Sequence, residues 1–132
     1  MGWYVWSNKS KYPVAANAVI TARDTITINA SGYAVPSPAP AAGVTGTVMG
    51  SSIEDVNNTG GADGDKSVTV EHSMGEFAFL FPGGALTIAD VGKDVFIGAN
   101  PKAITTTATN AVKAGRLQGI EDDGRARVIL PF

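Results

Sequence analysis

Several short stretches of the chain alternate between hydrophobic and polar residues, which is the period of a β-strand and not that of a helix. In residues 18–29, Ile26 and Ile28 share one face, and Thr25 and Thr27 share the other. This pattern predicts a half-buried strand, with the isoleucines in the core and the threonines toward solvent.

Further strands are expected at residues 43–49, 67–71, 76–81, 94–98, 103–109, 116–121 and 125–130. The last two form a hairpin across the turn Asp122-Asp123-Gly124. The strand at 76–81 is apolar on both faces, so we expect both faces to be buried. Either the fold covers both of them, or the fold covers one and a partner covers the other. Single helical turns are expected at 51–56 and at 86–93, the second closed by Gly92.

Three prolines interrupt the strand pattern: Pro36, Pro38 and Pro40 alternate with small residues. Because proline has no backbone N–H to donate, they predict an extended, polyproline-like loop over residues 36–43. The fold predicted is all-β: a small, single-domain barrel-like or sandwich-like fold of about seven or eight short strands. An extended N-terminal arm, residues 1–17, precedes the β domain, residues 18–132.

Composition supports β structure, because Val, Ile and Thr together number 34 whereas Leu numbers only four. The 132 residues include no cysteine, which excludes a disulfide scaffold and a cysteine-based zinc site. The net charge of −2 and the pI of about 5.2 lack the basic character of a nucleic-acid-binding protein. No apolar run approaches the roughly 20 residues of a membrane-spanning helix, and the N-terminus does not resemble a signal peptide.

Charged residues make up only 17% of the chain and are unevenly placed: residues 25–53 contain none. One interpretation is that the protein itself covers this stretch. The other is that another chain covers it, since the cores of protein interfaces are depleted in charge.

Both tryptophans of the chain lie near its start, in the cluster Trp3, Tyr4 and Trp6. Large aromatic residues at a terminus indicate either a strand tucked into the core or an arm that docks on a partner. The last residue, Phe132, is a candidate for packing against a neighbouring subunit.

Candidate catalytic and metal-binding residues are few. His72 is the single histidine and has no second ligand nearby in the sequence, so we expect a surface or capping role. Asp63 and Asp65 lie in a glycine-rich loop that fits a surface turn better than a calcium loop. The acidic cluster Glu121-Asp122-Asp123 fits a solvated hairpin turn. We therefore expect no catalytic residue, no cofactor and no metal site.

Residues 67–132 resemble the phage head-decoration proteins, also called capsid cement proteins. The resemblance lies in the order and spacing of five features, none of which is a chemical motif. They are the strand EFAFL at 76–80, the step LTIADVGKDVF at 86–96, a Thr-rich strand at 105–109, the strand VKAGRL at 112–117, and the acidic turn at 122–124 followed by RVIL at 127–130.

The resemblance implies a small all-β subunit, commonly a homotrimer, made in the host cytoplasm and placed on the outer surface of an icosahedral head. Its partner would be the major capsid protein, with no contact to nucleic acid or membrane. The candidate residues for capsid or subunit contact are Trp3, Tyr4, Trp6, Pro36, Pro38, Pro40 and Phe132.

Two other functions remain open. The chain could be an accessory β-domain of a phage tail or baseplate, or a carbohydrate-binding β-module that uses Trp3, Tyr4 and Trp6 as a platform. An enzyme of glycosidase type is a more distant reading, and would depend on Glu71 or Glu76.

Overall fold

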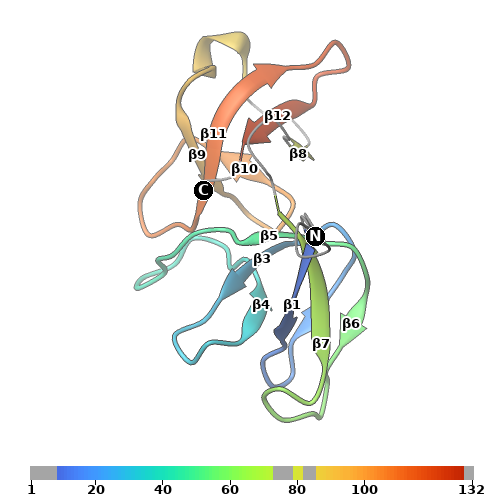
Figure 1. Ribbon diagram of the computed structural model, residues 1–132. Coiled ribbons are helices and arrows are strands. Elements are labelled where there is room, and N and C mark those ends of the chain that lie inside the picture. Colours follow the sequence, from blue (N-terminus) through green and yellow to red (C-terminus); the bar gives the residue numbers. More distant parts are fainter. Residues whose placement is uncertain (1–8, 73–78, 82–85, 130–132) are drawn as a thin grey trace, which may run out of the picture.

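The computed structural model describes residues 9–72, 79–81 and 86–129 (Figure 1). These residues form an all-β protein, as predicted, but with twelve short strands where seven or eight were expected, and one 3-10 turn. The elements are β1 (Lys9–Pro13), β2 (Val19–Ile20), β3 (Thr25–Ile28), β4 (Ala34–Pro36), β5 (Gly50–Ser52), β6 (Val56–Asn57), β7 (Ser67–Glu71), β8 (Phe79–Phe81), η1 (Ile88–Asp90), β9 (Asp94–Ile97), β10 (Ile104–Thr105), β11 (Lys113–Ile120) and β12 (Ala126–Ile129).

The first half of the chain forms a five-stranded antiparallel sheet in the order β1-β7-β5-β3-β4, which is the lower sheet in Figure 1. Its core contains Ile26, Val68 and Val70, all fully buried, as the alternation of Ser67–Glu71 predicted. A parallel bridge between Val14 and Ala34 joins the ends of β1 and β4, so the sheet curls toward itself without closing into a barrel.

The second half forms another five-stranded sheet, in the order β10-β9-β11-β12-β8. The predicted hairpin is present as β11 and β12, which pair antiparallel. The predicted helical turn near residue 88 is also present as η1, which is followed by Gly92 at a φ of 91°. This sheet has a core of its own, around Val95, Ile97 and Leu117.

Three local predictions of secondary structure are wrong. Residues 43–49 form no strand, only an isolated bridge from Thr47 to Lys113. Residues 51–56 are not a helical turn, because Gly50–Ser52 is a buried strand between β3 and β7. A Cβ at Gly50 would collide with the Glu71 carbonyl oxygen, so this central strand requires small residues that carry no hydrophobic signal. The Thr-rich strand predicted at 103–109 is reduced to Ile104–Thr105, because a bend and a turn follow at once.

The prediction that β3 is half-buried is also wrong, because Thr25 and Thr27 are buried like Ile26. The N–H and the hydroxyl of Thr25 both donate to the Pro101 carbonyl, at 3.1 and 2.6 Å. The loop between β9 and β10 therefore covers Thr25 at the junction between the two sheets, whereas the Thr27 hydroxyl lies against that of Ser37.

Two further contacts cross this junction. Lys102 Nζ lies 3.0 Å from the Asp24 carboxylate, whose side chain is almost completely buried. Val48, which belongs to the first half of the chain, is fully buried in the core of the second sheet. The two sheets are thus joined by a hydrogen-bonded, an ionic and an apolar contact.

The segment predicted as an N-terminal arm is described from Lys9 onward. Residues 9–13 form the edge strand β1, paired with β7, and Val14 is buried in the first core. Lys9, Lys11 and Pro13 place charge and a missing N–H along this edge, which discourages pairing with other chains.

We predict that Val48→Ala lowers the free energy of unfolding by about 2 kcal/mol, because it removes buried methyl groups and leaves a cavity. The control Val19→Ala makes the same chemical change at a side chain that is 51% exposed. It should lower the free energy of unfolding by less than about 0.5 kcal/mol. Urea unfolding followed by circular dichroism measures both, and equal losses would show that Val48 does not join the sheets.

Candidate functional site

A loop between β4 and β5 forms the most distinctive exposed feature of the described residues. We call residues 37–47 the proline loop; it projects where the two sheets meet (Figure 1, teal). From Pro38 to Thr47 every residue is exposed except Val44, which is half-buried, and none is charged. The loop therefore offers apolar and neutral polar groups to solvent.

The proline loop is fixed at its first residue. The Ser37 N–H donates to the Thr25 carbonyl at 2.9 Å, and its hydroxyl lies 2.7 Å from that of Thr27. Both hydroxyls are buried, so this hydrogen bond holds the start of the loop against β3. Pro36 was predicted to belong to the loop, but it is the last residue of edge strand β4, a position where proline's missing N–H faces away from the ladder.

The middle and end of the proline loop are fixed to the second sheet. Ala41 N–H donates to the Asn110 carbonyl at 3.2 Å, and Val44 packs on the second core. The backbone of Lys113 pairs with the end of the loop. Its N–H donates to the Gly46 carbonyl, and its carbonyl accepts from the Val48 N–H, both at 2.9 Å. The loop is therefore exposed but anchored at its first residue, its middle and its end.

A second uncharged loop lies beside the proline loop. Residues 103–112 contain no charged side chain, and Thr106 to Asn110 are all exposed. The hydrogen bond between Ala41 and Asn110 places these threonines next to the prolines. We call the exposed residues of 38–47 and 106–110 the uncharged surface. The charge gap at 103–112 is visible in the sequence, but only the fold brings it beside the proline loop.

This arrangement suits protein binding. Covering the uncharged surface requires no desolvation of an ion, and interface cores are depleted in charge for this reason. Proline and the hydrogen bonds limit the conformational entropy that the loops lose on binding. The first explanation for the uncharged residues 25–53 holds for β3 and β5, which the protein itself covers, whereas residues 38–47 are exposed save for Val44.

The remaining candidates for contact, Trp3, Tyr4, Trp6 and Phe132, lie outside the described residues. Of the two glutamates considered for hydrolysis, Glu76 also lies outside them. Glu71 is on β7, 3.7 Å from the guanidinium of Arg23.

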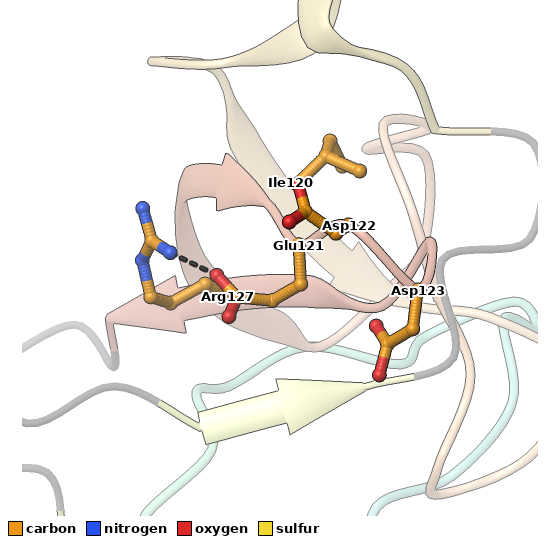
Figure 2. Close-up of a pocket in the computed structure, with 5 residues that line it drawn as sticks. All are labelled: Ile120, Glu121, Asp122, Asp123 and Arg127. Atoms are coloured by element: carbon orange, nitrogen blue, oxygen red, sulfur yellow. Dashed lines mark hydrogen bonds and ion pairs between the residues drawn. The ribbon is translucent and has the colours of Figure 1, made fainter.

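The acidic turn lines an open depression with Ile120 and Arg127 (Figure 2). The Glu121 carboxylate points at the Arg127 guanidinium and pairs with it, whereas Asp123 points away from that pair. The Arg125 N–H donates to Asp123 and lowers the pKa of its carboxyl group. Asp122 and Asp123 are exposed, as predicted for a solvated turn, whereas Glu121 is half-buried and paired with Arg127.

His72 and the Asp63 loop have structural partners. His72 Nδ1 lies 2.7 Å from the Met49 carbonyl, and the Asp63 carboxylate accepts from Ala16 N–H at 2.8 Å. Within the described residues, no three potential metal-ligating side chains gather in one place. In the same part of the chain, no helix has the length and hydropathy needed to cross a bilayer.

We predict that Ser37→Ala lowers the free energy of unfolding by about 1–2 kcal/mol, because the buried Thr27 hydroxyl loses its partner. Adding Thr27→Val should make the combined loss smaller than the sum of the two single losses, since both partners are then apolar. Urea unfolding of the four proteins tests this, and strictly additive losses would show that the hydroxyls do not interact.

Comparison of the chain with protein-family models, with curated proteins and with solved structures gave no match.

Proposed function

We propose that this protein is a structural virion component that decorates and stabilises the outer surface of an icosahedral phage head. It binds the major capsid protein, acts as a homotrimer and has no catalytic role. The observation that carries the proposal is the uncharged surface: two loops from different halves of the chain, exposed, free of charge and held by hydrogen bonds.

The first support is the chemistry of that surface. Proline, alanine, glycine and threonine side chains bury well against protein and leave few groups that need a specific partner. A surface of this kind suits a lasting contact with a large protein partner. An enzyme's substrate site, in contrast, needs a concave site with converging polar groups.

The second support is the position of the surface at the junction of the sheets. The surface is attached to both halves of the molecule, to the second core through Val48 and to β3 through the hydrogen bonds of Ser37. Attachment to both halves suits a clamp on a pressurised shell, and a trimer adds effective concentration for each further capsid contact. The net charge of −2 suits a position away from packaged DNA.

The resemblance of residues 67–132 to head-decoration proteins supports the same conclusion from the sequence. It covers the second sheet, including η1, β9 and the hairpin of β11 and β12. The uncharged surface draws one of its two loops from this half, so the resemblance and the surface coincide at residues 106–110.

We predict that Ala42→Glu and Thr107→Glu each weaken binding to empty, expanded heads of the parent phage by about tenfold or more. A buried, unpaired carboxylate costs more than the roughly 1.4 kcal/mol that a factor of ten requires. The matched control Ala89→Glu, on exposed η1, should bind like the wild type. Co-sedimentation of labelled protein with the heads measures the affinity.

Normal binding of both loop variants would show that the uncharged surface is not the capsid contact. A wild-type protein that ignores heads but labels tails in electron micrographs would overturn decoration in favour of a tail or baseplate role. A monomeric mass in solution and on the heads would overturn the homotrimer.

A further inference from the structure

The chain that leads into β3 contains a β-bulge with an arginine where glycine is usual. The Arg23 N–H donates to the Ser52 carbonyl, and the Ser52 N–H donates to the Asp24 carbonyl, both at 2.8 Å. Two residues, Arg23 and Asp24, therefore stand opposite Ser52 alone. This is the G1 type of bulge, whose first residue has a left-handed backbone and is typically glycine. Arg23 occupies that position with a φ of 74°.

The backbone around Arg23 is fixed by hydrogen bonds. The Thr21 N–H donates to the Asp24 carboxylate at 2.9 Å, and the Ala22 N–H donates to the Asp55 carboxylate at 2.7 Å. The Asp24 N–H closes the turn by donating to the Thr21 carbonyl at 3.0 Å. All four N–H groups from Thr21 to Asp24 are therefore bonded, so the fold sets the direction in which the Arg23 side chain leaves the backbone.

The left-handed backbone costs arginine more free energy than glycine, because the Cβ of an L-residue crowds the backbone there. The contacts of the Arg23 side chain offset little of this cost. The side chain is 67% exposed, and its guanidinium lies 3.7 Å from the Glu71 carboxylate. An exposed ion pair of this kind contributes little to stability. Backbone strain at a residue with an exposed side chain therefore indicates a role in binding.

Arg23 lies beside the uncharged surface. It is two residues from Thr25, whose carbonyl accepts the Ser37 N–H at the start of the proline loop. Two extended residues span about 7 Å, whereas an interface of standard size covers roughly 800 Å² of each partner. The adjacent Asp24 is buried and is already paired with Lys102. One interface can therefore include both the proline loop and Arg23.

The guanidinium group determines what Arg23 can bind. Interfaces have a core depleted in charge and a polar rim, and arginine is enriched in them. Arginine pairs with a carboxylate through two parallel N–H donors. We propose that Arg23 is a binding residue at the rim of the uncharged surface, and that it pairs with a carboxylate of the major capsid protein. This inference rests on the proposed function and adds one charged partner group to it.

Two substitutions at this position separate the side chain from the strain. Arg23→Ala removes the guanidinium but keeps a Cβ on the left-handed backbone, whereas Arg23→Gly removes both. We expect each to weaken binding to empty, expanded heads of the parent phage by about fivefold or more, because a charge-assisted hydrogen-bonded pair is lost. In urea unfolding, the midpoint of Arg23→Gly should lie roughly 0.5 M above that of Arg23→Ala.

The control Arg125→Ala removes another exposed arginine, which pairs with Asp123 in the acidic turn, and should bind heads like the wild type. Co-sedimentation at low and high sodium chloride gives a readout that a structural role would not change. Because salt screens an ion pair, it should weaken binding of the wild type more than binding of Arg23→Ala.

Wild-type affinity in both Arg23 variants would overturn the pairing while leaving the uncharged surface as the capsid contact. Equal urea midpoints of the two variants would show that the bulge is not strained, and would also overturn it. A trimer that dissociates in either variant would assign Arg23 to a subunit contact instead. If the wild-type protein does not bind heads, the proposed function fails and the pairing fails with it.

Discussion

The burial of Val48 in the second core is the contact on which the arrangement of the molecule depends. Each sheet has its own hydrophobic core, and the chain enters the second one before it has finished the first sheet. Residues 46–48 pair with Lys113 at the start of β11, so the same segment is anchored by backbone and by side chain. The two halves of the chain are therefore interlocked.

This interlocking explains why residues 25–53 contain no charge. Most of β3 and all of β5 are buried, because the loop around Pro101 covers Thr25 and Ser37 covers Thr27. A charge there would lose its hydration without a partner. The one buried carboxylate beside this stretch, Asp24, pairs with Lys102 across the junction. Burial does not explain the lack of charge in the exposed proline loop, which is consistent with an interaction surface.

The polar residues that the sequence offered as candidates for catalysis or metal binding have structural partners in the fold. Asp63 accepts from Ala16 N–H, His72 meets the Met49 carbonyl, and Asp123 accepts from Arg125 N–H within its own turn. Glu54 is held in the same way: the Thr69 N–H donates to its carboxylate and is the main cause of its lowered pKa. Each of these three carboxylates accepts a hydrogen bond from a backbone N–H, which gives it a structural role.

The sequence by itself determined the local features of this protein. Alternation identified Ser67–Glu71, β-branched content indicated an all-β fold, and the Asp-Asp-Gly turn located the hairpin of β11 and β12. These features are local because a strand's period and a turn's backbone depend on neighbouring residues. The tertiary structure alone decided that the threonine face of β3 is buried, that Gly50–Ser52 is a central strand, and that residues 38–47 and 106–110 form one surface. Those features depend on contacts between segments that are far apart in the sequence, and the packing of the two cores around Val48 determines which segments come into contact.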